Sequence, residues 1–128
     1  MVAYLDDICC FGKNFESSLE RLENILIRLN EAGLKLKTNK CVFFSSKIEL
    51  LGHEVSNSGI IPLGKNVEAI KQFPIPKKVK DVRSFIGLTS YYRKYILNFA
   101  KIASPLTDLT KKENKFCWDE DHNNAFNI

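Results

Sequence analysis

The sequence predicts an α+β protein in which short antiparallel strands and one helix come first and a group of helices follows. Short apolar runs separated by turn residues fill residues 1–61, which is typical of hairpins. One segment there, residues 15–32, instead carries leucines at steps of three and four, the spacing of an amphipathic helix. From residue 62 the apolar spacing is helical, interrupted by Pro74-Ile75-Pro76.

The stretch Tyr4-Leu5-Asp6-Asp7 is flanked by apolar residues on both sides, which predicts two short strands joined by a tight turn with both acids at its tip. Two-residue hairpin turns favour Asn-Gly or Asp-Gly, whose central residues tolerate positive φ. Adjacent carboxylates repel each other, and either solvent or a cation relieves the repulsion. Mg²⁺ prefers carboxylate oxygens. These four residues alone fit a solvated acidic turn as well as a metal-binding pair.

The helix over residues 15–32 has signals at both ends. Asn14 is the predicted N-cap, and Ser17 with Glu20 fits a capping box one turn later. Gly33 stands where a left-handed residue ends a helix. We expect the leucine stripe of this helix to pack as core against one face of the hairpin's sheet.

Residues 34–61 read as further strands. Residues 34–36 and 41–44 suggest short strand segments around a polar turn, and residues 48–56 a strand bent or turned at Gly52. Read alone, Gly52 is a hairpin turn and His53 a surface histidine, although a glycine in an apolar strand also marks close approach by another backbone.

The second half predicts helices over residues 65–73, 79–92 and 99–111. Pro105 is expected in a first turn or at a kink of the third helix. Gly87, inside the second helix, is expected to permit a close helix contact. Phe116, Cys117 and Trp118 form a strand-like step near the end.

The net charge of +4 is unevenly distributed: residues 1–61 carry −1 and residues 62–128 carry +5. Within the basic half, bases interleave with aromatic residues, a pattern that suits a nucleic-acid backbone. Solvated surface bases and core tyrosines explain the same pattern. The residues concerned are Arg83, Tyr91, Tyr92, Arg93, Lys94 and Tyr95.

Other classes of protein are disfavoured. No apolar run approaches the roughly 18 residues that span a bilayer, and an N-terminus bearing Asp6 and Asp7 does not resemble a signal peptide. We therefore expect an intracellular protein, cytoplasmic or nuclear, that is not secreted and has no membrane partner. The four cysteines lack Cys-x-x-Cys spacing and are expected to be reduced and mostly buried, and His53 and His122 are isolated, so no zinc site is expected.

Several blocks then occur in order, and together they resemble the reverse transcriptase of gypsy-class long-terminal-repeat retrotransposons, from its catalytic hairpin through its thumb. The resemblance covers nearly the whole chain and is far more specific than the four-residue motif. The blocks are Tyr4-Leu5-Asp6-Asp7-Ile8, Glu31-Ala32-Gly33-Leu34-Lys35-Leu36, Lys40-Cys41, Leu50-Leu51-Gly52-His53-Glu54-Val55-Ser56, Gly59-Ile60, Val82-Arg83-Ser84-Phe85-Ile86-Gly87-Leu88, Tyr91-Tyr92-Arg93-Lys94-Tyr95-Ile96 and Pro105-Leu106-Thr107-Asp108-Leu109.

The resemblance implies that residues 1–61 are the later part of a polymerase palm, residues 62–112 a helical thumb, and residues 113–128 the start of a connection to a ribonuclease H-like domain. It implies that Asp6 is a ligand of two catalytic Mg²⁺ (or Mn²⁺) ions and that Asp7 is a second, less directly coordinating carboxylate. Such ions lower the pKa of the primer 3′-hydroxyl and neutralise the leaving pyrophosphate.

It also implies nucleic-acid contacts and partners. Tyr4 would support the hairpin and Leu5 would approach the primer end, while Leu51, Gly52 and His53 match the primer-grip hairpin. Thumb residues that would follow the RNA/DNA template–primer duplex are Arg83, Tyr92, Arg93 and Lys94. Further partners would be an upstream palm–fingers segment, a downstream ribonuclease H-like domain of the same polyprotein and, in the complete enzyme only, deoxynucleotides.

The chain departs from the family pattern in one important respect. The family's site needs a third aspartate on an earlier palm strand, and only Met1, Val2 and Ala3 precede the motif here. We therefore expect no polymerase activity from this chain alone, and an uncovered apolar face prone to self-association. Cys9-Cys10 replaces larger aliphatic residues, and Lys78 stands where a helix-capping residue is usual. The alternatives are a non-catalytic nucleic-acid-binding remnant, a domesticated retroelement protein, and a translated relic without selected function.

Overall fold

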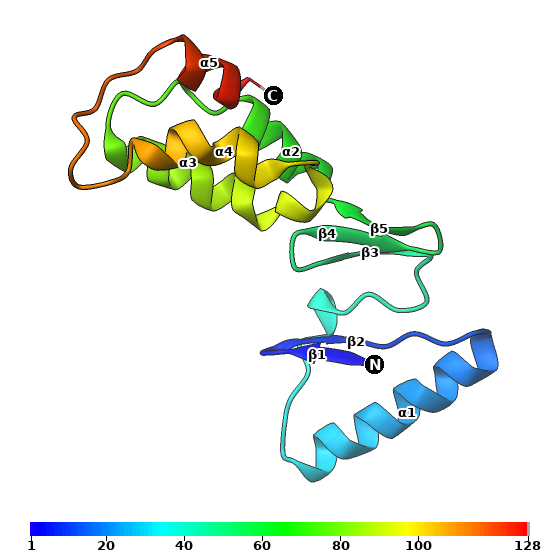
Figure 1. Cartoon of the computed structure of the whole chain (residues 1–128). Helices are drawn as coiled ribbons and strands as arrows, with labels where there is room; N and C mark the ends of the chain where they lie inside the picture. Colours follow the sequence, from blue (N-terminus) through cyan, green and yellow to red (C-terminus); the bar gives the residue numbers. More distant parts are fainter. Residues whose placement is uncertain (128) are drawn as a thin grey trace. The chain divides into compact units, whose positions relative to one another are not determined.

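The polypeptide divides into two units, Met1–Leu63 and a second that begins at Gly64 (Figure 1). The computed structural model describes residues 1–127. The first unit contains β1 (Val2–Tyr4), β2 (Asp7–Cys9), α1 (Phe15–Glu31), η1 (Thr38–Lys40), β3 (Lys47–Leu50), β4 (His53–Ser56) and β5 (Gly59–Pro62). The second contains α2 (Gly64–Lys71), α3 (Val79–Tyr91), η2 (Arg93–Tyr95), α4 (Phe99–Asp108) and α5 (Glu120–Phe126). The predicted α+β class is confirmed.

Helix α1 starts and ends at residues with clear local signals. The Asn14 side chain accepts a hydrogen bond of 2.9 Å from the Ser17 backbone N–H, and the Ser17 hydroxyl accepts one from the Asn14 N–H at 3.3 Å. Asn14 is thus the N-cap as predicted, but its capping-box partner is Ser17, so the expected box between Ser17 and Glu20 is wrong. At the other end Gly33 has a φ of 67°, and Leu34 donates to the Leu29 carbonyl at 2.9 Å. These features form a Schellman motif.

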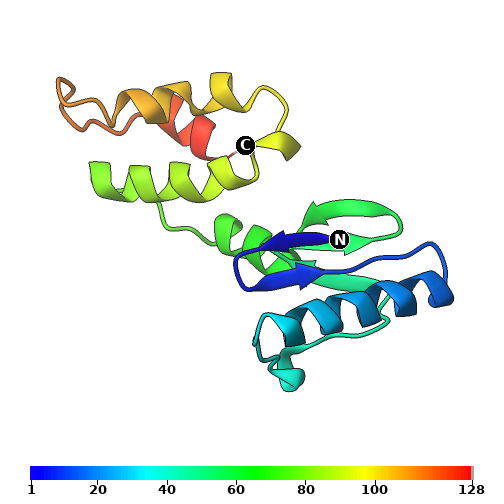
Figure 2. The same cartoon turned by 90° about the horizontal axis from the view of Figure 1, so that it is seen from below.

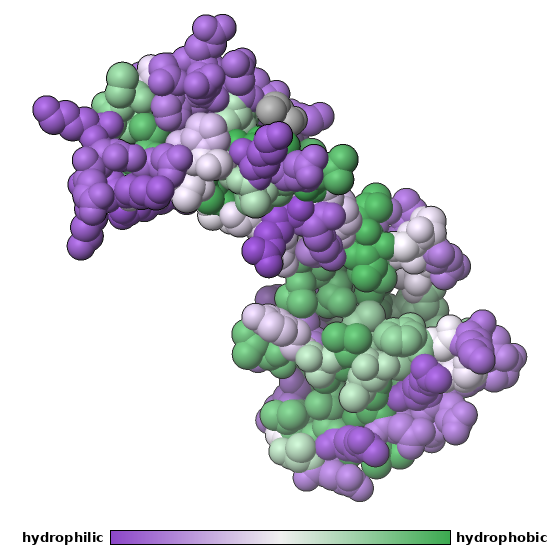
Figure 3. Space-filling view, in the orientation of Figure 1, coloured by the Kyte–Doolittle hydropathy of each residue, from purple (hydrophilic) through white to green (hydrophobic). Residues whose placement is uncertain are grey.

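The apolar stripe of α1 is not a buried core. None of the residues of α1 is buried, and Leu19 and Leu26 remain 47% and 40% exposed. The expectation of core packing is therefore wrong, because Leu63 is the one buried apolar side chain in residues 1–63 and the stripe has no closed interior to enter. In the view of Figure 3, broad apolar areas lie on the surface of this first unit.

Helix α1 runs beside the β1–β2 hairpin (Figures 1 and 2). Arg21 Nη1 donates a 2.6 Å hydrogen bond to the Phe11 carbonyl, which ties the helix to the segment after β2. An open hollow of about 170 Å³ lies against the same helix, lined by Met1, Arg21, Asn24, Ile25 and Arg28. The packing between helix and hairpin is thus loose.

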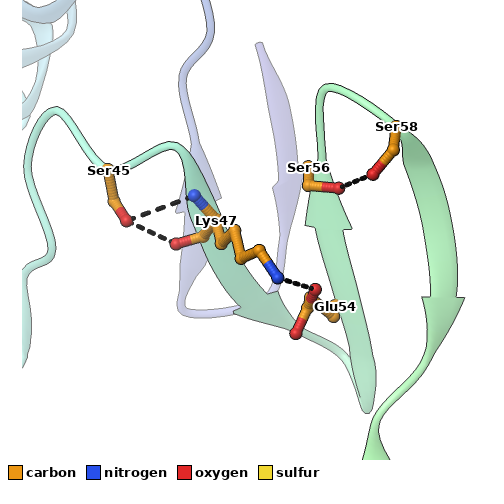
Figure 4. Close-up of polar contacts among 5 residues, drawn as sticks. All are labelled: Ser45, Lys47, Glu54, Ser56 and Ser58. Atoms are coloured by element: carbon orange, nitrogen blue, oxygen red, sulfur yellow. Dashed lines mark hydrogen bonds and ion pairs between the residues drawn. The ribbon is translucent and has the colours of Figure 1, made fainter.

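Strands β3, β4 and β5 form an antiparallel meander with two-residue turns at residues 51–52 and 57–58. The predicted strand over residues 48–56, turned at Gly52, is confirmed. Cross-strand partners share a face, so the register places Ile48, Val55 and Ile60 on one face. The opposite face carries Lys47, Glu54 and Ser56 together with the apolar Ile61. On it Lys47 Nζ lies 2.9 Å from Glu54 Oε1 (Figure 4).

The strand segments expected at residues 34–36 and 41–44 are absent. Apart from the 3₁₀ turn η1, residues 34–46 are irregular. Neither segment has a neighbouring strand to pair with in residues 1–63, and a strand needs such a ladder to satisfy its backbone. Phe44 instead takes a φ of 51° and packs its ring 4.9 Å from that of Phe15.

The second unit has a true core. Val82 and Phe85 of α3 pack with Leu106 and Leu109, and all four are at most 6% exposed. Helix α5, which the sequence analysis did not anticipate, closes this core: the Phe126 ring lies 4.6 Å from that of Phe85. The expected strand-like step at residues 116–118 is an irregular segment leading into α5.

Helix α5 begins with a capping box between Asp119 and His122. The His122 backbone N–H donates to the Asp119 carboxylate at 3.2 Å. This hydrogen bond is the largest cause that holds the pKa of Asp119 below its ordinary value, with the nearby His122 ring adding to it.

Pro105 lies inside α4, beyond its first turn, which excludes the first-turn placement and leaves the expected kink a prediction. The expectation about Gly87 in α3 is wrong. Gly87 is exposed, and a Cβ added there would meet nothing within 4 Å, so no close helix contact requires a glycine.

Candidate metal-binding hairpin and nucleic-acid interface

The β1–β2 hairpin presents the two candidate metal ligands at different places. Tyr4 pairs with Asp7, so Leu5 and Asp6 are the two turn residues and Asp7 is the first residue of β2. The expectation that both acids form the turn is therefore corrected. Leu5 has a φ of 49°, and Asp6 does not have a positive φ. The positive φ of this turn therefore falls on Leu5 and not on an aspartate.

Asp6 and Asp7 are both exposed. Adjacent exposed carboxylates fit a hard divalent cation, because they offer oxygen ligands and the cation relieves their repulsion. Among residues 1–127, no three His, Cys, Asp or Glu side chains gather as one metal-ligand group. The described part of the chain therefore offers a pair of candidate ligands and gathers no third side chain beside them.

The second candidate element is the turn between β3 and β4. Leu51 and Gly52 have φ values of 46° and 70°, the positive pair of a type I′ turn. His53 Nδ1 lies 2.8 Å from the Leu51 carbonyl, and because a carbonyl only accepts, Nδ1 is the donor. The Gly52 carbonyl accepts from the Leu63 backbone N–H at 3.0 Å. The turn is thus braced on both sides.

Leu5 and Leu51 share a strained conformation at the tips of the two candidate hairpins. A non-glycine residue in the left-handed region costs about 1–2 kcal/mol, and such strain is concentrated at functional sites. Leu5 is also 87% exposed. Sequence reasoning missed this feature, although the absence of glycine or asparagine from a two-residue turn at Leu5-Asp6 was a signal for it.

The four thumb candidates differ in their surroundings. Arg83 Nη2 donates a 2.9 Å hydrogen bond to the Thr110 carbonyl, beyond the end of α4. Tyr92 is only 4% exposed, and its hydroxyl accepts a 2.7 Å bond from Asn66 Nδ2. Arg93 and Lys94 lie in η2 and are exposed. The structure therefore leaves Arg83, Arg93 and Lys94 exposed, pairs Arg83 with a backbone carbonyl, and buries Tyr92.

All four cysteines, each in the described part of the chain, are free thiols; Cys9, Cys10 and Cys41 are half-buried and Cys117 is exposed. Among residues 1–127, no helix combines the length and apolar character needed to cross a bilayer.

The chain is similar to known proteins over most of its length. Residues 1–55 match the family described as reverse transcriptase (RNA-dependent DNA polymerase). The chain is 43% identical over 114 residues to the retrovirus-related Pol polyprotein from transposon 297 of Drosophila melanogaster, a match covering 89% of this chain and 11% of that protein. It is 40% identical over 111 residues to the Pol polyprotein from transposon gypsy of the same organism, covering 87% of this chain and 11% of that protein.

A solved structure is also similar. It is that of a foamy viral protease-reverse transcriptase in complex with double-stranded DNA, with a TM-score of 0.79 and 25% identity, covering 91% of this chain and 21% of that one. Residues 1–55 therefore belong to the reverse transcriptase family, and the chain as a whole is similar to reverse transcriptases. Within that family its relatives include Pol polyproteins of the gypsy-type transposons, which confirms the expected resemblance. The chain spans about a tenth of the length of these relatives.

Proposed function

We propose that this chain is a segment of a retrotransposon RNA-directed DNA polymerase that contributes two metal-binding aspartates and a duplex-binding surface. The observation that carries the proposal is the hairpin. Within residues 1–55, which belong to the reverse transcriptase family, the Tyr-x-Asp-Asp motif folds into a tight turn with both carboxylates exposed. Residues 1–61 would serve as part of a palm, residues 62–112 as a thumb, and residues 113–128 as the start of a connection.

Asp6 and Asp7 would hold Mg²⁺ or Mn²⁺, two ions in the complete enzyme. When bound, such ions lower the pKa of the primer 3′-hydroxyl and neutralise the leaving pyrophosphate. The chain's own contribution is positional, because the turn at Leu5–Asp6 holds one carboxylate at the tip and the strand pairing of Asp7 with Tyr4 fixes the second. Since residues 1–127 gather no third ligand, we propose that the chain alone does not polymerise.

Each unit would supply its own nucleic-acid contacts. Leu5, supported by Tyr4, would approach the primer end, and the Leu51–His53 turn would approach the primer strand. Arg93 and Lys94, which are exposed, would contact phosphates. Support comes from the +5 charge of residues 62–128 and from the double-stranded DNA bound by the foamy viral relative.

The metal role can be tested directly on this chain with Mn²⁺. Mn²⁺ broadens the NMR signals of nuclei near it, so titration into the full chain should broaden amide signals around Asp6 and Asp7 first. Asp6→Asn removes a charge and a ligand and should weaken the broadening several-fold. Glu20→Gln, an exposed acid on α1, is the matched control and should leave the pattern unchanged. Uniform broadening at acids throughout the chain would refute a site at the hairpin.

A non-catalytic nucleic-acid-binding remnant, such as a domesticated retroelement protein, is the second candidate. The charge asymmetry and the absence of a third ligand among residues 1–127 favour it. It predicts duplex binding that weakens steeply with salt, survives Asp6→Asn and drops on removal of the Arg93 charge. Mn²⁺ broadening localised at Asp6 and Asp7 would favour the polymerase segment over the remnant.

A further inference from the structure

Tyr92 is buried, and a hydrogen bond links it to another helix. Asn66 Nδ2, in α2, donates to the Tyr92 hydroxyl at 2.7 Å, joining residues 26 positions apart. Tyr92 directly follows α3 and is 4% exposed, so its ring cannot present a face to a nucleic acid. The bond is partly buried, where a hydrogen bond is stronger and an unsatisfied polar group is costly.

The rings around Tyr92 form the surface that carries exposed bases. Tyr91 meets Tyr92 edge-on with centroids 5.0 Å apart, and Tyr95 lies 6.5 Å from it. Tyr91 is 53% and Tyr95 38% exposed. Lys94 Nζ in turn lies 4.8 Å from the centre of the Tyr95 ring. Tyr92 is therefore the buried ring beside the exposed rings and their neighbouring cation.

The backbone at Tyr92 also sets the direction of the 3₁₀ turn. The Tyr92 N–H bonds back to the Thr89 carbonyl at 3.0 Å, and the Tyr92 carbonyl accepts from Tyr95 at 2.9 Å. The same residue thus ends α3 and begins η2, which holds Arg93 and Lys94. Fixing the Tyr92 side chain fixes the orientation of this turn.

We infer that Asn66 and Tyr92 are positioning residues whose hydrogen bond orients the surface formed by Tyr91, Arg93, Lys94 and Tyr95 for binding to the phosphate backbone of a nucleic-acid duplex. This inference rests on the proposed function. It assigns Tyr92 an indirect role in place of the direct contact that the sequence suggested, and it assigns a role to Asn66, which no motif marked.

The test is fluorescence anisotropy of a labelled RNA–DNA duplex with the full chain at several salt concentrations. Variants are Tyr92→Phe, which removes only the hydroxyl, Asn66→Ala and the double variant. The matched control is Ser84→Ala, which removes an exposed side-chain bond to the Lys80 carbonyl on α3 and touches none of the rings. Circular dichroism gives the folded fraction at the assay temperature, and each Kd is corrected for it.

Each single variant should weaken duplex binding by about threefold to tenfold, and the double variant no further, because the two residues act through one bond. The slope of log Kd against log salt should fall by about one, since a misoriented turn contacts fewer phosphates.

A purely structural role would lower the melting temperature and leave the corrected Kd and the salt slope at wild-type values, and that result overturns the inference. Wild-type chain that binds no duplex at any salt concentration would overturn the proposed function and this inference with it. Should Tyr92→Phe fail to fold, Asn66→Ala decides alone.

Discussion

Arg83 Nη2 donates a 2.9 Å hydrogen bond to the backbone carbonyl of Thr110, linking α3 to the segment just beyond the end of α4. The guanidinium satisfies a backbone carbonyl of this segment, and its positive charge complements the dipole at the C-terminal end of α4. Arg83 therefore supports the second unit whether or not it also meets a phosphate.

Arg83→Ala should lower the stability of the second unit by about 1 kcal/mol, or roughly 4–8 °C in melting temperature for a unit of this size. Arg93→Ala, which removes an exposed base from η2, is the control and should leave the melting temperature unchanged. Both substitutions should weaken duplex binding. Thermal unfolding followed by circular dichroism distinguishes the two variants. Equal melting temperatures for Arg83→Ala and Arg93→Ala would show that the Thr110 contact does not contribute to stability.

The two units should differ in stability. Within residues 64–127 the buried hydrophobic side chains include Val82, Phe85, Tyr92, Ala103, Leu106 and Leu109, whereas residues 1–63 have only Leu63. In native-state hydrogen exchange on the full chain, amides of α3 and α4 should be protected most, and those of α1 and the β1–β2 hairpin should exchange faster by a factor of 100 or more, on the order of the gap between local and global opening. Equal protection of α1 and α3 would contradict the packing described.

Leu51→Asn should separate stability from function at the β3–β4 turn. Asn tolerates the left-handed region and Asn-Gly is the favoured type I′ pair, so the hairpin should gain about 0.5–1 kcal/mol. If the Leu51 side chain approaches the primer strand, the same variant should bind duplex less tightly. Ile60→Asn, a polar change at a 53% exposed position in the same sheet, is the control and should not stabilise it. Unchanged amide exchange in β3 and β4 of Leu51→Asn would contradict the strain argument.

Acid should destabilise the second unit partly through Asp119. The pKa of Asp119 is lowered in the folded chain, chiefly by the hydrogen bond from the His122 backbone N–H, relative to its ordinary value of 3.8. A lowered pKa means that the contribution is fully present above the ordinary value and is lost as pH falls through the folded value. Asp119→Asn should therefore flatten the fall in melting temperature between about pH 5 and pH 2, whereas Asp121→Asn, in the same helical turn, should not. Parallel curves for wild type and Asp119→Asn would refute this role.

Local signals in the sequence predicted the features that depend on a few neighbouring residues. Asn14 and Gly33 bracket α1 because a side-chain acceptor and a left-handed glycine act within one turn. Gly52 marks the β3–β4 turn for the same reason. The motif residues Asp6 and Asp7 were found, but the turn was placed one residue too late, because the sequence does not reveal that Leu5 accepts a positive φ.

Features that depend on distant residues could not be predicted. Leu19 is exposed because residues 1–63 form no buried core against which α1 could pack. The amphipathic spacing of a helix is the same whether or not a packing partner is present. The sequence pattern fitted Tyr92 both as a core tyrosine and as a nucleic-acid contact, and its burial and its hydrogen bond to Asn66 appear only once α2 and α3 pack. Arg83 gave a basic signal, and its bond to Thr110 appears only once α3 and α4 pack. Helix α5 was not predicted, because the helix that follows the capping box of Asp119 and His122 is short and has only Ala125 and Phe126 as apolar residues.

The most direct test of the central claim is primer extension on an RNA template with Mg²⁺ or Mn²⁺. The chain is assayed alone and together with a palm–fingers polypeptide from a gypsy-type Pol polyprotein, each with wild-type chain and with Asp6→Asn. We predict no synthesis by the chain alone, synthesis in the mixture, and loss of that synthesis with Asp6→Asn. Synthesis by the chain alone, or synthesis in the mixture that survives Asp6→Asn, would contradict the account.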